Sequence, residues 1–393
     1  MNILFVNDIP FNPRYGGIER VTDLIVRELL KYRYNIYYLS GKMSNTEILN
    51  YSYPVKLYQL PESGFFAATK NKEYYRSLLK ELEINVVVNQ RGTFDFMDSM
   101  LHYGGIRTIS VLHSVMDSSV ICYFYSRQEN FRWKIKNYIK KCFYPLYVNI
   151  KKRQLYKDLY KHYEELIRKG STIVVLSNSC AKELADFIKP LEANIKIINN
   201  PCNIPMEKIN LDIKDKTILF VGRLDSAEKQ PIRLLKVWKR LYKQYKEWSL
   251  VFVGDGDAMN VMQKFVSKNN IERVTFAGQQ SNVAEYYRKA SFVCLTSNYE
   301  GWGMALTEGM AYGCIPFAFN SFGAASEIID DGVNGCLVSP FSIAEYSDKL
   351  GILMQEDVLR KNMALAAIDK VKIFSLNNVV AKWDNLFKSL IEN

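Results

Sequence analysis

Short, almost wholly apolar runs alternate along this chain with longer segments of helical periodicity, and this alternation limits the possible folds more than any other feature. Runs that are apolar throughout predict strands buried on both faces, because a strand with one face in water alternates apolar and polar residues. The segments between them are amphipathic, as in Gly17–Tyr32, where Ile18, Val21, Leu24 and Ile25 recur at helical spacing. The pattern predicts parallel sheets with helices on both faces.

The alternation occurs twice, on either side of a turn-rich break at residues 199–205. We therefore expect two doubly wound α/β domains, at residues 1–202 and 203–375, and a final helix within residues 376–393. Ligands of such sheets bind beyond the carboxyl ends of the strands. The expected strands are Ile3–Asn7, Ile36–Leu39, Val86–Asn89, Thr108–Leu112, Ile173–Ser177 and Lys196–Asn199, then Thr217–Gly222, Leu250–Gly254, Val274–Phe276, Phe292–Thr296, Ile315–Phe319 and Gly335–Val338.

Composition favours a reduced, intracellular globular protein. The seven cysteines are odd in number and scattered, without a Cys-x-x-Cys pair, which predicts free thiols in a cytoplasmic protein. The first residues predict a strand rather than a signal peptide. No apolar run reaches the roughly 18 residues that a membrane-spanning helix needs.

The most informative motif is a pair of acidic residues, Glu300 and Glu308, the first in a Gly-rich turn and the second in a helix-like run. The start of a helix offers unpaired N–H groups and the positive end of the helix dipole to an anion. Carboxylates in turn accept hydrogen bonds from hydroxyls. A nucleotide sugar combines both features, because its diphosphate is flanked by two polyhydroxyl rings.

Further candidate residues follow predicted strands. Gly16 and Gly17 precede a helix after the first strand, and Gly222-Arg223 follows the first strand of the second half, with Lys229 six residues beyond Arg223. Asp255-Gly256-Asp257 has the spacing of an Asp-x-Asp metal motif. We interpret it as a strand-end turn, which favours Gly and Asp.

With these motifs in this order, the chain resembles the retaining glycosyltransferases of family 4, which have the GT-B fold of two Rossmann-like domains facing a cleft. The resemblance runs nearly end to end and is strongest over Glu300–Gly313. It implies transfer of a hexose or N-acetylhexosamine from a nucleoside-diphosphate sugar, a UDP-sugar being favoured. The implied acceptor is a glycan, lipid-linked, in surface polysaccharide synthesis. The final helix is implied to return to the N-terminal domain.

The resemblance also implies roles for individual residues. Arg223 and Lys229 neutralise the donor diphosphate, Glu308 binds the ribose, and Glu300 lies beside the transferred sugar. His113 lines the sugar pocket from the N-terminal domain. The other implied donor-binding residues, through backbone or close approach, are Gly16, Gly17, Gly222, Trp302, Gly303, Met304 and Ala305.

The implied chemistry needs no metal or other cofactor. We expect the acceptor hydroxyl to attack on the face that the leaving group occupies, because the sequence nominates no carboxylate nucleophile for the opposite face.

Three places depart from the family pattern. Asn199-Asn200-Pro201 stands where the family usually has Asn-Gly, and Gly323-Ala-Ala-Ser-Glu327 replaces Gly-Gly-x-Pro-Glu. Ser114 follows His113 where an acidic residue is common. The second departure resembles a variant found in some enzymes of lipid-linked oligosaccharide assembly.

The net charge of +11 is concentrated in residues 132–169, which hold twelve basic and three acidic residues interleaved with aromatic ones. Three interpretations remain open: a surface for anionic membranes, a helix that packs its aromatic face on the core, or a nucleic-acid site, which we do not expect. The first would place the protein on the inner face of the cytoplasmic membrane.

Two further function classes remain as alternatives. One is a nucleotide-sugar epimerase or hydrolase of the same fold. The other is a basic membrane- or nucleic-acid-binding protein without catalysis.

Overall fold

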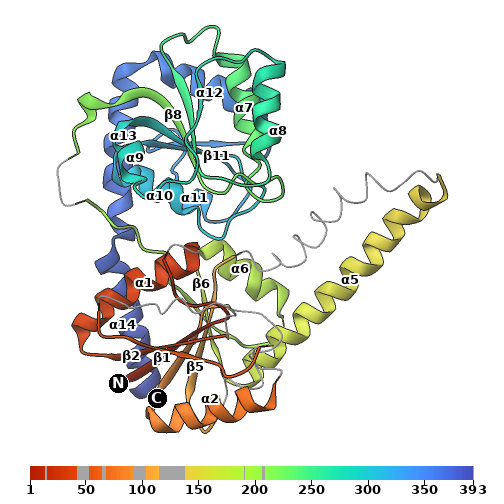
Figure 1. Cartoon of the computed structure of the whole chain (residues 1–393), viewed down its shortest axis with the longest axis vertical. Helices are drawn as coiled ribbons and strands as arrows, with labels where there is room; N and C mark the ends of the chain where they lie inside the picture. The colour runs from red at the N-terminus through yellow and green to blue at the C-terminus, as the bar shows by residue number, and fades with distance from the viewer. Residues whose placement is uncertain are drawn as a thin grey trace. The chain divides into compact units, whose positions relative to one another are not determined.

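The computed structural model of the chain describes residues 1–13, 16–41, 53–63, 68–91, 103–114, 138–189, 191–205 and 209–392, with the backbone alone over 138–149. The chain forms two compact units (Figure 1). Unit 1 comprises Met1–Pro201 together with Leu376–Asn393, and unit 2 comprises Cys202–Ser375. Each unit contains one parallel sheet with helices packed against it.

Unit 1 has a seven-stranded sheet in the order β3-β2-β1-β4-β5-β6-β7, and all neighbouring strands are parallel. Strands β4 and β6 are buried along their whole length, as expected for a sheet covered on both faces. The strands are β1 (Asn2–Asn7), β2 (Asn35–Ser40), β3 (Lys56–Gln59), β4 (Val86–Asn89), β5 (Arg107–Leu112), β6 (Thr172–Val175) and β7 (Asn194–Ile197).

The helices of unit 1 bury apolar faces against this sheet. Leu4 and Val6 of β1 pack with Leu78 and Leu79 of α2, while the alternate residues Ile3 and Phe5 are buried as well, so both faces of β1 are covered. The last helix, α14, packs against α1. The helices are α1 (Gly17–Leu29) continued by η1 (Leu30–Tyr32), α2 (Thr69–Glu81), α5 (Tyr138–Arg168), α6 (Asn178–Phe187) and α14 (Leu376–Glu392).

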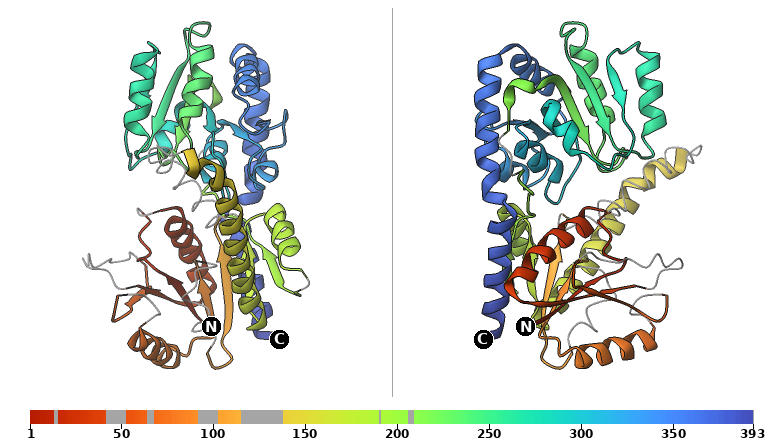
Figure 2. Two further views of the ribbon diagram at one scale, coloured as in Figure 1. Left: turned by 90° about the vertical axis from the view of Figure 1, so that its right-hand side faces the viewer. Right: turned by 60° about the vertical axis from the view of Figure 1, so that its left-hand side comes forward.

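Unit 2 has a six-stranded sheet in the order β10-β9-β8-β11-β12-β13, again with all neighbours parallel. Strands β11 and β12 are wholly buried. Figure 2 shows helices on both sides of this sheet. The strands are β8 (Asp215–Val221), β9 (Ser249–Val253), β10 (Val274–Phe276), β11 (Ala290–Leu295), β12 (Ile315–Phe319) and β13 (Cys336–Val338).

From the central strand β8 the chain proceeds outward to β9 and β10, then returns beside β8 and proceeds outward on the other side through β11, β12 and β13. Helix α12 packs on α7, and α13 packs on α10. The helices are η3 (Leu211–Ile213), α7 (Ile232–Leu241), α8 (Met259–Lys268), α9 (Ala284–Lys289), α10 (Met304–Ala311), α11 (Ala325–Ile328), α12 (Ile343–Gln355), α13 (Asp357–Val371) and η4 (Lys372–Phe374).

The strand order in each unit reverses beside its first strand. In unit 2 the reversal lies between β8 and β11, and in unit 1 between β1 and β4. Loops that leave two strands on either side of such a point diverge to opposite faces of the sheet and leave a crevice for ligands. The residues after β8 and β11 are therefore the first place to look for a site in unit 2.

Every predicted strand is present with its ends displaced by at most two residues, and within the described residues the one strand that was not predicted lies at a sheet edge. Strand β3 was not predicted, and β7 (Asn194–Ile197) begins two residues before the predicted Lys196–Asn199. Both strands lie at the rims of the unit 1 sheet and carry polar residues such as Lys56 and Lys196. Edge strands are half-covered, so they lack the continuous apolar run that marks the central strands.

The basic segment 132–169 falls partly outside the described residues, namely at 132–137, and the side chains of 138–149 are not described either. Over residues 150–168, α5 is an amphipathic helix on the unit 1 sheet. Leu159, Tyr163 and Leu166 are buried against β5, β6 and α6, while Lys157 and Lys161 are exposed. This part of the segment follows the core-packing interpretation.

Two composition-based expectations can be compared with the described residues. Cysteines 180, 202, 294, 314 and 336 are buried and form no disulfide among the described residues, whereas the side chains of Cys122 and Cys142 lie outside the described part. Within the described residues, no helix combines the length and the apolar character needed to cross a membrane.

Candidate functional site

Two glycine turns at the carboxyl ends of β8 and β9 form the floor of the site in unit 2. Gly222 and Gly254 have φ angles of 150° and 139°, in the region that favours glycine. A Cβ on Gly254 would lie 1.9 Å from the carbonyl oxygen of Gly222, so the two backbones touch. The N–H of Gly222 also donates to the Val253 carbonyl at 3.0 Å. This close approach fixes the chain just before Arg223.

The turn after Arg223 is built around the carboxylate of Asp225. Its Oδ1 accepts the backbone N–H groups of Ala227, Glu228 and Lys229 at 3.2, 2.6 and 3.2 Å. Such a side chain replaces the backbone acceptors that a tight turn lacks. The turn ends at Gln230, immediately before Pro231 and α7, and it holds Glu228 and Lys229 in fixed positions.

The loop after β11 is tied to the same turn. The Asn298 N–H donates to the Glu228 carbonyl at 2.7 Å, and its Nδ2 donates to the Ala227 carbonyl at 2.6 Å. Arg233 of α7 donates to Asn298 Oδ1 at 2.7 Å and to the Thr296 carbonyl at 3.0 Å. These bonds join the loops on either side of the strand-order reversal into one rigid cradle.

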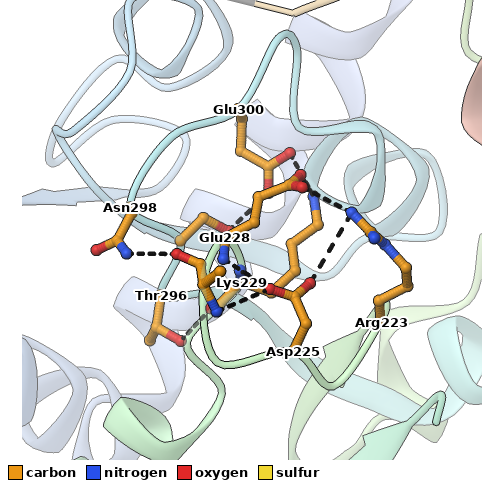
Figure 3. Close-up of polar contacts among 9 residues, drawn as sticks. Arg223, Asp225, Glu228, Lys229, Thr296, Asn298 and Glu300 are labelled. Carbon is orange, nitrogen blue, oxygen red and sulfur yellow. Dashed lines mark hydrogen bonds and ion pairs between the residues drawn. The ribbon is translucent and has the colours of Figure 1, made fainter. Parts of the chain in front are cut away.

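A cluster of five charged side chains lies in this cradle (Figure 3). Lys229 Nζ lies 2.6 Å from Glu300 Oε2 and 3.0 Å from Glu228 Oε1. Arg223 Nη2 lies 2.6 Å from Glu228 Oε2 and 3.9 Å from Asp225 Oδ2. The side chain of Glu300 is 8% exposed and that of Lys229 is 17% exposed, whereas that of Arg223 is 69% exposed.

The charges in this cluster support one another. Burial alone would lower the pKa of Lys229, but the carboxylates of Glu300 and Glu228 outweigh it, and the net pKa is raised. The pKa of Arg223 is likewise raised, because Glu228 and Asp225 outweigh the effect of burial. Both side chains are therefore cations at physiological pH.

Glu300 is fixed by a second contact, since the Ser297 hydroxyl donates to its Oε1 at 2.6 Å. The chain then passes through Trp302, which is 2% exposed and packs edge-on against Phe374 with ring centroids 4.9 Å apart. Gly303, with φ 91°, precedes α10, and a Cβ there would lie 3.3 Å from the Phe322 ring. Gly303, which has no side chain, thus connects the turn to α10. The first backbone N–H groups of that helix belong to Met304 and Ala305.

Glu308 lies further along α10 and has a different partner. The Tyr287 hydroxyl donates to its Oε2 at 3.0 Å. Tyr287 is 2% exposed and stacks on Tyr312, with ring centroids 6.0 Å apart. A buried, stacked tyrosine therefore orients the Glu308 carboxylate.

The remaining predicted site residues belong to unit 1. Gly16 caps the start of α1, and Gly17 is the first residue of that helix. Glu19, also in the first turn, accepts a hydrogen bond from Asn7 Nδ2 at 2.9 Å. Arg14 and Tyr15, which precede this turn, lie outside the described residues.

His113 follows β5, and its Nε2 hydrogen-bonds to Gln90 Oε1. Arg91, next to Gln90, forms an ion pair with Asp8 at the end of β1. Burial and the nearby Arg91 charge lower the pKa of His113 to about 4. The imidazole is therefore neutral at physiological pH, a hydrogen-bonding group rather than a cation.

The structure thus brings Arg223, Lys229 and Glu300 into one contact network. Asp225, Glu228, Asn298 and Tyr287 were not predicted as site residues from the sequence. Asn298 had one usable signal, because it is the second residue after a predicted strand. Tyr287 had none, since a tyrosine on an amphipathic helix usually packs in the core.

Asp255 and Asp257 are both exposed, and the Asp255 carboxylate accepts the N–H of Gly256 at 2.7 Å. This is the geometry of the predicted strand-end turn. A search of the described residues finds no grouping of three or more His, Cys, Asp or Glu side chains suited to a metal ion.

Two doubly wound parallel sheets, the second with a cation and carboxylate cluster where its strand order reverses, place the protein in the GT-B class of folds. Residues 204–370, nearly all of unit 2, match the family described as glycosyl transferases, group 1. Unit 2 is therefore similar to the domain that defines this family, and the chain as a whole has the GT-B fold.

Individual relatives agree with this assignment. The chain is similar to the amylovoran biosynthesis glycosyltransferase AmsD of Erwinia amylovora, with 32% identity over 174 residues, which cover 44% of this chain and 48% of that protein. Among the curated relatives that it matches first, the chain spans about half of their length.

A longer alignment links the chain to a Campylobacter jejuni protein named N-acetylgalactosamine-N,N'-diacetylbacillosaminyl-diphospho-undecaprenol 4-alpha-N-acetylgalactosaminyltransferase. The two are 26% identical over 388 residues, which cover 91% of this chain and 94% of that protein. The crystal structure of Anabaena Alr3699/HepE with UDP and glucose shares the fold, with a TM-score of 0.72, 15% identity and coverage of 98% and 99% of the two chains.

Proposed function

We propose that the protein transfers a sugar from a nucleoside-diphosphate sugar to a glycan acceptor. The observation that carries this proposal is the cluster of Arg223, Lys229 and Glu300 at the strand-order reversal of unit 2. Two cations at the carboxyl ends of the strands suit a diphosphate, and a buried carboxylate beside them suits the hydroxyls of the attached sugar.

In this proposal the cations stabilise the leaving group. As the bond between the anomeric carbon and the phosphate oxygen breaks, negative charge grows on the diphosphate, and Arg223 and Lys229 stabilise it. The N–H groups and positive dipole at the start of α10 add to this effect. Side chains and backbone thus supply the charge that a metal ion supplies elsewhere, and we propose that no metal or other cofactor is required.

Glu300 and Glu308 divide the remaining contacts. Glu308, oriented by Tyr287, accepts hydrogen bonds from the ribose hydroxyls, and Glu300 accepts them from the transferred sugar. His113, neutral with a pKa of about 4, contributes hydrogen bonding rather than charge.

The donor and acceptor are proposed from the relatives. A UDP-sugar is favoured because the HepE structure contains UDP and glucose. A hexose or N-acetylhexosamine, and an acceptor on a lipid diphosphate, fit the name of the Campylobacter relative. Such an acceptor would bring the protein to the inner face of the cytoplasmic membrane, and the basic residues of α5 offer it an attractive surface.

We further propose that the anomeric configuration is retained by attack on one face. The acceptor oxygen bonds to the anomeric carbon while the phosphate oxygen leaves, and the acceptor proton passes to that phosphate oxygen. The contacts of Glu300 with Lys229 and Ser297 stabilise its carboxylate charge and lower its nucleophilicity, while each oxygen keeps a lone pair that can accept a hydrogen bond from the sugar.

Glu300→Gln tests this mechanism. We expect turnover to fall about 100-fold or more, because the transferred sugar loses a charged hydrogen bond, with no sugar attached to the protein. Intact-mass spectrometry during turnover checks the second point. A sugar adduct on any side chain of this variant would contradict same-face attack.

Donor consumption with and without acceptor tests the function itself. A glycosyltransferase consumes UDP-sugar rapidly only when a lipid-linked glycan is present. Equal consumption without acceptor would favour the hydrolase or epimerase alternative, and no consumption with any nucleotide sugar would reject both.

A further inference from the structure

The unit 2 cluster carries more negative than positive side chains, so its net charge opposes the binding of an anion. Arg223 and Lys229 face three carboxylates, those of Asp225, Glu228 and Glu300. The cluster therefore has an excess of negative charge before any ligand arrives. A diphosphate entering beside it would meet repulsion unless one carboxylate leaves the cations.

Asp225 and Glu300 are both held by other bonds. Asp225 Oδ1 accepts three backbone N–H groups of its own turn. Glu300 is nearly buried and accepts the Ser297 hydroxyl in addition to Lys229. Moving either carboxylate would break the turn or leave hydrogen-bond donors without partners, which is costly in a buried site.

Glu228 is held differently. Within the described part of the chain its carboxylate is bound through the two cations alone, with one oxygen on Arg223 and the other on Lys229. Its side chain is 24% exposed, and that of Arg223 is 69% exposed. The contact with exposed Arg223 is weak because water screens it, and Lys229, which is 17% exposed, keeps Glu300 as a partner when Glu228 leaves.

The two oxygens of Glu228 also bridge the cations as two oxygens of a diphosphate would. We propose that Glu228 is an internal counter-anion, which occupies the two diphosphate-binding cations in the free enzyme and is displaced when the donor binds. Its return to Arg223 and Lys229 then promotes release of the nucleoside diphosphate product. This inference rests on the proposed function, because it assumes that these cations bind the diphosphate.

For Glu228 the proposal predicts a change in ligand affinity opposite to the usual one. Removing a residue that shapes a binding site normally weakens binding, whereas Glu228→Gln should strengthen it. Glutamine keeps the size of the side chain but removes the charge that competes with the ligand. We expect the Kd of UDP, measured by titration calorimetry on the full chain, to fall about tenfold, with slower UDP dissociation in stopped-flow displacement. Inorganic pyrophosphate should show the same direction.

Two further variants sharpen the test. Glu247→Gln removes one negative charge from an exposed pair with Lys216 elsewhere in unit 2, and it should leave the Kd nearly unchanged. Glu228→Asp keeps the charge but shortens the side chain, so it cannot span both cations, and its Kd should lie between those of wild type and Glu228→Gln. This second variant also serves if Glu228→Gln does not fold.

The outcomes separate the two proposals. Tighter UDP binding by Glu228→Gln, with Glu247→Gln unchanged, supports the counter-anion role. Equal or weaker binding by a folded Glu228→Gln, while the wild type binds UDP, overturns that role and leaves the glycosyltransferase proposal intact. Absence of nucleoside diphosphate binding by the wild type overturns both.

Discussion

At the scale of single residues, side chains that are distant in the sequence determine each other's state. Lys229 and Glu300 are 71 positions apart, yet their ion pair keeps a nearly buried ammonium charged. The sequence predicted both as site residues from their places after strands. It could not predict their contact, because that depends on which strands become neighbours. Glu228 was missed as a site residue for the same reason.

Tyr287→Phe tests the orientation of Glu308. The change removes the hydroxyl that donates to Glu308 Oε2 but keeps the buried ring. We expect the KM for the donor to rise by about three- to tenfold, because a hydrogen bond to a charged group is lost, while kcat and the melting temperature change little. The measurement is steady-state kinetics with thermal melting.

A purely structural role for Tyr287 would lower stability instead. Binding of UDP and of its 2′,3′-dideoxy analogue gives a second readout, since the preference for UDP should shrink in Tyr287→Phe. Tyr286→Phe, one residue earlier on α9, is the matched control and should behave as wild type. An unchanged preference in Tyr287→Phe would contradict a link to the ribose.

At the scale of elements, the central strands and their turns were predictable, and so were the edge strands β10 and β13, but the edge strand β3 was not. Buried strands such as β11 carry an unbroken apolar run, whereas β3 at the rim of unit 1 is half-exposed and polar. Glycines after β8 and β9 were predicted to mark turns. Their mutual contact was not, because it arises from the parallel pairing of β8 with β9.

Gly254→Ala tests this contact. The new Cβ would meet the Gly222 carbonyl oxygen at 1.9 Å, and the backbone is left-handed, so both clash and strain oppose it. We expect a loss of about 3–5 kcal/mol in the free energy of unfolding of unit 2, measured by denaturant titration. UDP affinity should fall as well, because the clash would displace Gly222 and with it the next residue, Arg223.

Gly278→Ala is the control for strain alone. Gly278 is also left-handed, with φ 69°, but nothing lies within 4 Å of its Cβ position. Its cost should be about 1–2 kcal/mol. If both alanine variants lost the same stability, backbone contact between the turns would have no measurable importance.

At the scale of the whole molecule, unit 1 is assembled from two separate parts of the chain. Helix α14 packs on α1 and buries Val379, Val380, Trp383 and Phe387. Lys382 donates to Asn199 Oδ1 at 2.9 Å, which ties α14 to the end of the first segment. The alternation of strands and helices indicated two domains, but where the last helix packs was available only through the resemblance.

Deletion of residues 376–393 tests this assembly. We expect unit 1 to lose its cooperative structure, because α1 exposes the apolar surface that α14 covers, while unit 2 stays folded. Hydrogen exchange resolves the two units: amides of β1 and β4 should exchange quickly and those of β8 and β11 should remain protected. A shorter deletion of residues 392–393 should leave both protected.

Uniform protection after the longer deletion would show that α14 adds nothing to unit 1. Uniform loss would show that the two units fold as one.

The first and last residues of unit 2 pair with each other, and this affects the order in which the two units can fold during translation. Cys202 and Ser375 form an isolated parallel β-bridge through their backbones, and the Cys202 N–H donates to the Phe374 carbonyl at 2.7 Å. Unit 2 is thus an uninterrupted segment that is complete once Ser375 has left the ribosome. Unit 1 begins first but must wait for α14. Although N-terminal domains usually fold first during translation, here the later unit can finish before the earlier one.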